Sequence, residues 1–358
     1  MNKVKIGDLQ MTDKHIEMVL DIAKSGQLTE GKYSRLLEKQ MEEFLGVKHA
    51  ILVTNGTVSL QLIGQYLTHK KGKGLNVCVP AMTFPATING FLITGHNVSL
   101  CDIGEDLQID ISTLSEAEKK EIDVIVPVHL MGYAADMEAI CSYDWTVVED
   151  TAESFGTLLN GKKAGTFGDF GSFSFYVSHN IWAGELGMVT TNDDEAASVM
   201  RSMKNHGRTG DSMKFLHTYV GSNYKTTEFM AGIGYVNLQN ADDIISKRRN
   251  NAQFFADSIT NSKLKPFPVD GDFSPLGYPI LCESEEYKDF IVGKLNDKNV
   301  ETRGIFPNLA NQVAYSGMFD SEKYPIANRM EKTVFYIGIH QYLTQNDLDL
   351  VVNVINNN

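Results

Sequence analysis

The stretch SFSFYVSHNIWAGELG, from Ser172 to Gly187, combines small hydroxyls, aromatic rings and one histidine ahead of a Gly-Glu-x-Gly turn. Its pattern is typical of an enzyme segment that carries a reactive lysine, but the residue at that place is His179. Ser174 offers a hydroxyl for an anion, and an imidazole can move protons near neutral pH. A lone histidine is usually structural, yet its place in a predicted loop between glycine-containing segments favours a functional role.

A carboxylate, Asp150, ends the apolar run TVVED, at a point where a parallel strand delivers a side chain to a ligand. One carboxylate there suits a pyridinium nitrogen, because its negative charge keeps the ring protonated and electron-withdrawing. Glu153 follows three residues later and can face the same ligand. The alternative role for Asp150 is the N-cap of a helix over AESFG.

Two earlier apolar runs also end in candidate ligand-binding residues. Gly56 and Thr57 open a helix after HAILVT, and glycine lets the backbone N–H groups of a helix N-terminus approach a phosphate. A plain strand-to-helix turn is the alternative there. Phe84 follows NVCVPA, where its ring can lie against a flat ligand, and a core position is the alternative.

The elements that position these residues alternate from about residue 48 to 200, which predicts βαβ units and a mainly parallel sheet. We expect strands over HAILVT, NVCVPA, VSLCDI, DVIVPVHL and TVVED, and helices over GTVSLQLIGQYL and FPATINGFLIT. The tail begins with a long amphipathic helix, DDIISKRRNNAQFFADSI, followed by shorter strands and helices. We therefore place a cofactor-binding domain at 1–240 and a smaller α+β domain at 241–358.

Composition limits the class of protein. The chain has 358 residues, 42% of them hydrophobic, and a net charge of -13, which argues against a nucleic-acid partner. The four cysteines are widely spread, so we expect buried thiols and no metal or iron–sulfur site. The N-terminus lacks a signal-peptide pattern, and no apolar run is long enough to cross a membrane. A cytoplasmic location is therefore expected.

Taken in order, the phosphate turn, aromatic residue, carboxylate, serine and pivotal residue resemble the pyridoxal-phosphate (PLP) enzymes of fold type I. More narrowly, the chain resembles the DegT/DnrJ/EryC1/StrS sugar aminotransferase family, which acts on nucleotide-linked keto sugars. Nine stretches along nearly the whole chain carry the resemblance. They are SGQLTEGKYSRLLEKQMEEFLGVKHAILVTNGTVSLQL, VPAMTFPATING, PVHLMGYAADME, VVEDTAESFGT, GTFGDFGSFSFY, GELGMVTTN, KNHGR, SNYKTTEFMAGIGYVNLQ and, more weakly, YLTQNDLDLVVNVI.

The resemblance implies roles for the candidate residues. Gly56, Thr57 and Ser174 would bind the cofactor phosphate, Phe84 would stack on the ring, and Asp150 would pair with its nitrogen. Two further implied positions are Glu153, beside the ring, and Asn223, which would reach the phosphate of a neighbouring subunit. The chain would then be a homodimer with composite active sites. The lysine that holds the cofactor covalently in the family falls on His179, so the cofactor would be held without a covalent bond.

A branch of the family with this replacement is typified by GDP-4-keto-6-deoxymannose 3-dehydratase, which uses pyridoxamine phosphate (PMP). By this resemblance, His179 would move the proton at C4′ of the cofactor while the sugar loses its C3 hydroxyl, and L-glutamate would regenerate the amine form. The chain departs from that branch at Asn180, where the characterised enzymes have a second histidine. TAESFG is also closer to the perosamine-type aminotransferases.

Two alternative functions therefore stay open: an aminotransferase-like enzyme with non-covalent cofactor, and a non-catalytic binding protein on the same fold. Several other residues also have two interpretations. His129, His206 and His340 are expected to be scaffold rather than catalytic. Three basic residues are candidate contacts for the nucleotide diphosphate, namely Lys204, Arg208 and Arg303.

Overall fold

The structure is a computed structural model, and it describes residues 3–210, 215–269 and 272–358. Its main element is a seven-stranded sheet with the strand order β1-β9-β8-β5-β4-β2-β3. The strands are β1 (His49–Val53), β2 (Asn76–Pro80), β3 (Asn97–Cys101), β4 (Val124–Ile125), β5 (Thr146–Asp150), β8 (Phe170–Ser174) and β9 (Gly187–Thr191). The predicted α/β class is confirmed, since a mainly parallel seven-stranded sheet with helices along it is joined to a smaller antiparallel sheet.

The sheet is mixed rather than uniformly parallel. Strands β3, β2, β4, β5 and β8 run parallel to one another, whereas β9 is antiparallel to both β8 and β1. The reason is the connection between β8 and β9, which contains no helix and returns the chain beside β8 as an antiparallel neighbour. The predicted strand over DVIVPVHL is shorter than expected, because regular pairing covers only Val124–Ile125 and Pro127 has no N–H to donate.

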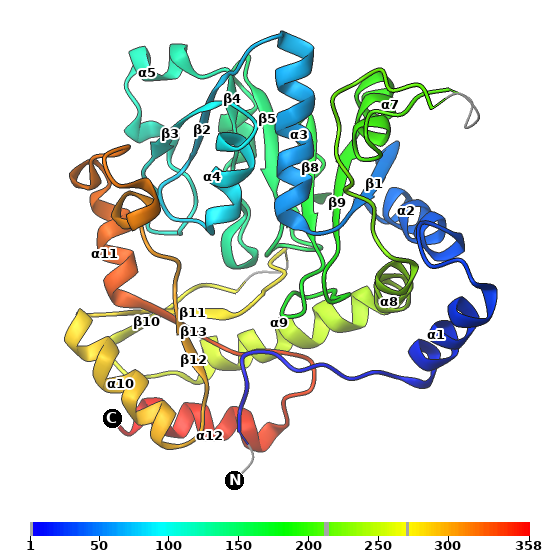
Figure 1. Ribbon diagram of the computed structural model, residues 1–358. Coiled ribbons are helices and arrows are strands. Elements are labelled where there is room, and N and C mark those ends of the chain that lie inside the picture. Colours follow the sequence, from blue (N-terminus) through cyan, green and yellow to red (C-terminus); the bar gives the residue numbers. More distant parts are fainter. Residues whose placement is uncertain (1–2, 211–214, 270–271) are drawn as a thin grey trace.

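Helices cover the main sheet. The helix α3 (Gly56–Lys71) lies across one face, beside α4 (Pro85–Leu92) and α7 (Asp194–Met203) (Figure 1). On the other side of β1, α2 (Lys32–Leu45) and α1 (Asp13–Ser25) both pack against α8 (Glu228–Leu238). Shorter elements of this part are α5 (Glu116–Glu121), α6 (Met137–Ile140), β6 (Leu158–Leu159) and β7 (Lys162–Lys163).

A second, smaller sheet is antiparallel, with the strand order β10-β11-β13-β12. The strands of this sheet and the helices of the same part of the chain are α9 (Ala241–Ser258), β10 (Leu264–Pro266), β11 (Tyr278–Cys282), α10 (Glu285–Asp297), β12 (Thr302–Gly304), α11 (Pro325–Thr333), β13 (Val334–Ile337) and α12 (Gln345–Asn356). The first described residues also lie here, because Val4 forms a β-bridge with Val300 and the N-terminal segment runs along this part (Figure 1). The domain division at residue 240 stays a prediction.

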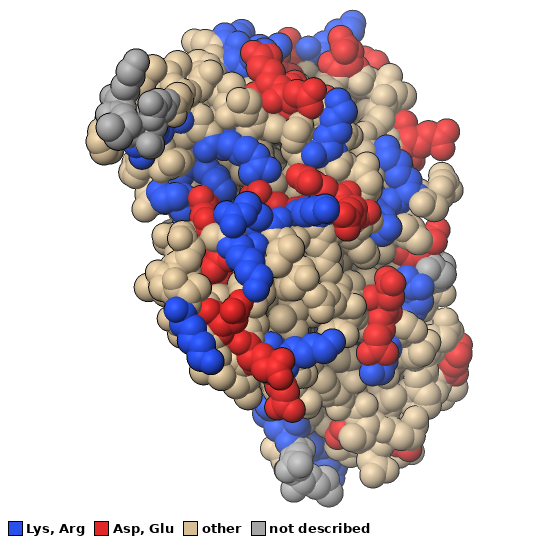
Figure 2. Space-filling view, turned by 90° about the vertical axis from the view of Figure 1, so that its right-hand side faces the viewer, with Lys and Arg blue, Asp and Glu red and all other residues tan. Residues whose placement is uncertain are grey.

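On the face over α1, α2 and α8, Lys and Arg alternate with Asp and Glu around an uncharged central area (Figure 2). Cys78, Cys101 and Cys282 are buried as predicted, but Cys141 is exposed, because it follows the short helix α6 at the surface. None of the described helices is both long and apolar enough to span a membrane.

Candidate active site

The first part of the site is a close contact between the start of α3 and the end of β8. A Cβ atom added at Gly56 would lie 2.7 Å from Cβ and 3.2 Å from Oγ of Ser174. Any side chain at residue 56 would therefore fill the space between the helix N-terminus and the serine hydroxyl. Thr57 follows in the same first turn, so backbone N–H groups and hydroxyls converge at one point, as a phosphate group requires.

The geometry of this turn follows from its neighbours. The side chain of Asn55 caps α3 by accepting a hydrogen bond from the Val58 N–H at 3.0 Å. Gly187 begins β9 directly beneath the turn, where an added Cβ would lie 2.2 Å from the carbonyl carbon of Asn55. Only glycine fits at residue 187, which explains the last glycine of the GELG motif. The structure thus brings Gly56, Thr57 and Ser174 together, as the sequence predicts.

Asp150 is buried at the end of β5, with two hydrogen bonds and no cation. Its Oδ2 accepts from the Thr87 hydroxyl at 2.8 Å, and its Oδ1 accepts from the Ala152 N–H at 3.2 Å. No ion pair between described residues includes this carboxylate. Burial raises its pKa, and the Thr87 hydrogen bond lowers it in part. No helix forms over AESFG, so the alternative of a helix cap is wrong.

The hydrogen bond between Thr87 and Asp150 also fixes the segment that carries Phe84. Phe84 precedes α4 by one position, and the hydroxyls of Thr83 and Thr87 on either side of it are 2.9 Å apart. Since Thr87 also binds Asp150, the segment that carries Phe84 is tied to the buried carboxylate. The Phe84 side chain is 56% exposed, so the alternative of a core position is wrong. A large exposed aromatic ring beside a buried carboxylate fits a flat, cationic ring such as pyridinium.

Glu153 lies in the turn that follows Asp150. It is buried, and its Oε2 accepts a hydrogen bond from the Met131 N–H at 3.0 Å. Burial raises its pKa to about 8, and the nearby charge of Asp150 contributes to the rise. At neutral pH the carboxyl group is therefore protonated, and its O–H can donate a hydrogen bond to an electron-rich oxygen.

His179 lies in the loop that connects β8 to β9, shortly after Ser174, the last residue of β8. Its Nδ1 is 3.1 Å from the carbonyl oxygen of Ser174. A carbonyl only accepts, so Nδ1 carries the proton and Nε2 keeps a free lone pair. Burial lowers the pKa of His179 to about 4, while the hydrogen bond to Ser174 raises it slightly. The imidazole is thus neutral at pH 7, with Nε2 available as a base.

The remaining candidates are placed less centrally. Asn223 is exposed, and its Oδ1 accepts from Lys225 Nζ at 2.6 Å. Lys204 is not a diphosphate contact in this chain, because its Nζ is buried and donates to the Leu52 carbonyl at 2.9 Å. The Arg303 side chain is 55% exposed, which leaves its guanidinium accessible to a ligand. The guanidinium of Arg208 lies over the Phe215 ring, 4.7 Å from its centroid.

The three histidines considered as scaffold differ from His179. His129 is fully buried, with Nε2 donating to the Glu149 carboxylate at 2.9 Å and Nδ1 accepting from the Ala135 N–H at 3.0 Å. Both ring nitrogens are therefore occupied, as in a structural histidine. His206 is exposed at a position of positive φ, and His340 is buried. Sequence reasoning missed Thr87, although a buried hydroxyl four residues after Thr83 in an apolar helix is a usable signal.

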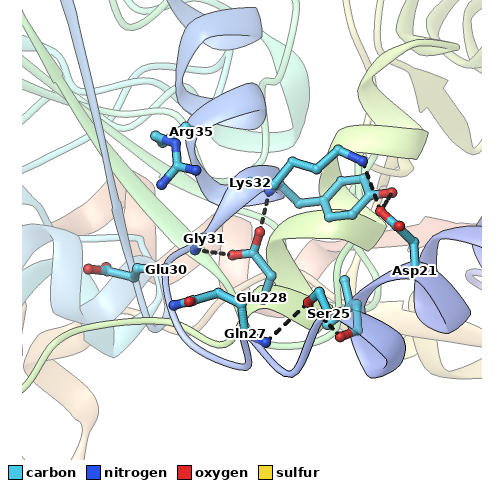
Figure 3. A pocket seen from close by; sticks show the side chains of 10 residues that line it. Asp21, Ser25, Gln27, Glu30, Gly31, Lys32, Arg35 and Glu228 are labelled. Carbon is cyan, nitrogen blue, oxygen red and sulfur yellow. Dashed lines mark hydrogen bonds and ion pairs between the residues drawn. The ribbon is translucent and has the colours of Figure 1, made fainter.

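A surface pocket of about 270 Å³ lies elsewhere, between α1 and α2, and contains none of the candidate residues. One of the carboxylates that line it, Glu228, accepts hydrogen bonds from the Gly31 N–H and from the Tyr33 N–H (Figure 3). A second, Asp21, forms an ion pair with Lys32. These groups cap α2 and bind one another, so they hold the chain rather than a ligand. The candidate site is defined by the chemistry at the strand ends and not by this pocket.

Comparison with known proteins agrees with the geometry. The profile of the DegT/DnrJ/EryC1/StrS aminotransferase family matches residues 9–356. GDP-perosamine synthase of Escherichia coli O157:H7 is 32% identical over 335 residues, which cover 91% of this chain and 90% of that protein. Helicobacter pylori PseC, an aminotransferase of pseudoaminic acid biosynthesis, shares the fold with a TM-score of 0.92 at 23% identity, over 99% of this chain and 98% of that one.

The third relative is a dehydratase. The GDP-4-keto-6-deoxy-D-mannose-3-dehydratase of E. coli, solved with hydrated PLP bound, has a TM-score of 0.90 and 25% identity and covers 99% of both chains. Relatives with different reactions thus share one fold, and the enzyme class that they have in common is PLP-dependent chemistry on sugars. Both the sequence match and the fold lead to one conclusion: the chain belongs to the DegT/DnrJ/EryC1/StrS aminotransferase family.

Proposed function

We propose that this chain is a PMP/PLP-dependent dehydratase, which removes the C3 hydroxyl of a nucleotide-linked 4-keto-6-deoxy sugar. The observation that carries the proposal is the state of His179. By the sequence resemblance it falls where the family has its lysine. Its Nδ1 is fixed by the Ser174 carbonyl, and its Nε2 is left unprotonated. Such a group can move a proton but cannot store the cofactor covalently.

The residues described above suit non-covalent binding of the cofactor. Gly56, Thr57 and Ser174 would bind its phosphate, and Phe84 would cover its ring. Asp150 lacks a cation within the described chain, and a protonated ring nitrogen would supply one and offset the cost of burying the carboxylate. When bound, PMP supplies an amine for the sugar ketone and a ring that takes up electrons.

His179 would then act twice on one proton. Its neutral Nε2 would take up the proton at C4′ of the cofactor, which would make the imidazole a cation. Because the pKa of this imidazole is low, the cation would readily return the proton to the departing C3 oxygen, which would leave as water. Glu153, protonated at neutral pH, would donate its O–H beside the ring and would not add a second negative charge next to Asp150.

The overall change balances without a further reductant. The sugar loses oxygen at C3, L-glutamate is oxidised to 2-oxoglutarate in restoring the amine form, and the amino nitrogen leaves as ammonia. Asn223 would complete the phosphate site of a neighbouring subunit, so we propose a homodimer as the active form. Its exposed position fits a residue that serves another chain.

A second candidate is transfer of the amino group to the sugar, as in a perosamine synthase. It is favoured by the sequence identity of 32% to such an enzyme, which exceeds the 28% identity to a GDP-4-keto-6-deoxy-D-mannose 3-dehydratase. The two reactions differ in the fate of nitrogen: the transferase leaves it on the sugar, whereas the dehydratase releases it.

The test starts from the absorbance spectrum of the purified protein with PLP. We expect a free-aldehyde band that shifts to the amine band on addition of L-glutamate, and then ammonia release with a 4-keto sugar linked to GDP, dTDP, UDP or CDP. The His179→Lys variant is the matched control, since its lysine should bind the cofactor covalently as an imine, with an absorbance band distinct from that of the free aldehyde, and should lose ammonia release. Failure of the wild-type protein to retain cofactor at excess would overturn the proposal.

A further inference from the structure

One buried cation is not explained by the site as described. Arg248 lies on α9 and is 3% exposed. Its Nε donates to the Pro275 carbonyl at 2.9 Å, one terminal nitrogen donates to the Leu276 carbonyl, and the other to Gln341 Oε1 at 3.4 Å. All three acceptors are neutral, and no ion pair between described residues includes Arg248. Burying a guanidinium without a carboxylate is costly, so a function should offset that cost.

The segment that Arg248 holds reaches the histidine loop. Ser274, next to Pro275, is fully buried. Its carbonyl oxygen and its Oγ each lie 3.3 Å from the Nδ2 of Asn180, the residue that follows His179 in the chain. The contacts therefore run from α9 through residues 274–275 to the side chain of Asn180, which lies in the same loop as His179.

The Ser274 contacts also reach the turn that carries the second carboxyl group. Its hydroxyl donates to the Phe155 carbonyl, and an added Cβ at Gly132 would lie 2.2 Å from the Ser274 carbonyl oxygen. Gly132 follows Met131, whose N–H binds Glu153. One buried serine from the C-terminal part thus locks two loops of the site against each other.

The charge of Arg248 also acts on the imidazole directly. Burial is the main reason that the pKa of His179 is low, and the positive charge of Arg248 lowers it further. The other imidazole beside Arg248 is His340, which is affected in the same way. Beyond His340 lie Asp8 and Asp347, whose charges oppose the effect, and Lys5, whose charge adds to it.

We propose that Arg248 is a positioning residue for His179: it fixes the loop through Ser274 and Asn180, and its unpaired charge opposes protonation of the imidazole. This inference rests on the proposed function for its consequence, which is that the imidazolium formed during turnover gives up its proton readily. The contacts and the charge exist in the chain itself, so they can be tested without cofactor.

The test is a pH titration of the histidine rings by NMR in the cofactor-free protein, with His179 identified by comparison with the His179→Asn variant. Arg248→Gln removes the charge. Gln341→Glu keeps the arginine but gives it a carboxylate partner. Arg249→Gln is the matched control, because Arg249 is the next residue of α9 and holds the same segment through the Phe273 carbonyl at 2.7 Å.

We expect Arg248→Gln and Gln341→Glu each to raise the titration midpoint of His179 by a fraction of a pH unit, since one opposing charge is removed or compensated while burial, the main cause of the low pKa, remains. Arg249→Gln should leave it unchanged. Unchanged midpoints in the first two variants, or an equal shift in the control, would overturn the proposal. If the Arg248→Gln variant does not fold, the titration midpoint of His179 in the Gln341→Glu variant tests the proposal by itself.

Activity provides a second and separable readout. If the proposed function holds, the acid limb of kcat/KM for ammonia release should move to higher pH in the same two variants, by the same shift. Midpoints that shift in a wild-type protein that releases no ammonia would mean that the proposed function fails while the role of Arg248 stands.

Discussion

Two polar regions of the site respond to burial in opposite directions. At the end of β5, burial raises the pKa values of Asp150 and Glu153, and the neighbouring groups are hydroxyls and N–H donors. In the loop between β8 and β9, burial lowers the pKa of His179, and the positive charge of Arg248 lowers it further. The first region needs a cation to balance its carboxylate, and the second is kept free of charge. A ring with a protonated nitrogen at one end and a reacting carbon at the other matches both.

The largest expected effect comes from removing the charge in the first region. Asp150→Asn keeps an oxygen that accepts from Thr87 but cannot hold the ring nitrogen protonated. We expect the rate of the glutamate half-reaction to fall by about a hundredfold or more, equivalent to about 3 kcal/mol. Rapid-mixing absorbance measures it. A Thr87→Val control should lose far less, and a wild-type rate in Asp150→Asn would remove the carboxylate from the account.

The second prediction concerns Glu153 and stability. Its pKa is raised from an ordinary 4.5 to about 8 in the folded protein, so between these values the folded state binds more protons than the unfolded state. The free energy of unfolding should therefore decrease as pH rises from about 4.5 to 8. In Glu153→Gln this decrease should be smaller by a few kcal/mol at most, on the order given by the shift.

Urea unfolding of the cofactor-free protein at a series of pH values provides that comparison. The informative quantity is the difference in free energy of unfolding between wild type and variant. A difference that stays constant from pH 4.5 to 8 would show that Glu153 is not protonated in the folded protein.

The contribution of His179 to the free energy of unfolding should depend on pH with the opposite sign to that of Glu153. Its folded pKa of about 4 is below its ordinary 6.5, so between these values the unfolded state binds more protons. Its contribution to the free energy of unfolding should rise with pH from about 4 to 6.5 and be lost as pH falls through that window, on the order of 2 kcal/mol. His179→Asn, which cannot titrate, should lack the rise. The same unfolding series tests it, and parallel curves would contradict it.

The smallest expected effect concerns the phosphate turn. Gly56→Ala places a Cβ 2.7 Å from the Ser174 Cβ, so we expect a loss of about 1–3 kcal/mol of stability and of cofactor retention. Adding Ser174→Gly removes the clash and should restore stability but not retention, because the hydroxyl is gone. Thermal unfolding and cofactor titration separate the two. Restored retention in the double variant would exclude Ser174 as a phosphate ligand.

The comparison also shows what a sequence can predict. The first region was predicted from local pattern, because Asp150 ends an apolar run and parallel strands deliver their ends to one edge. Gly56 and Ser174 were predicted in the same way. The antiparallel direction of β9 was not predicted, since it depends on the connection after β8 rather than on the residues of the strand itself.

The second region depends on contacts between distant parts of the chain. Ser274 lies 94 positions from Asn180 in sequence, and no local pattern pairs them. Arg248 did leave a signal, because it lies on the apolar face of α9 with Ile244, Ala252 and Phe255, where a charge is unexpected. Its partners, two backbone carbonyls and the side chain of Gln341, could be found only in the folded structure.

The most direct test of the central claim is the fate of the amino nitrogen. The protein is incubated with PLP, ¹⁵N-labelled L-glutamate and the 4-keto sugar nucleotide that it consumes, and the label is followed by NMR. We predict labelled free ammonia together with a sugar that has lost its C3 hydroxyl, in equal amounts, and neither product with His179→Asn. Label retained at C4 of a sugar that keeps its C3 hydroxyl would contradict dehydration and identify an aminotransferase.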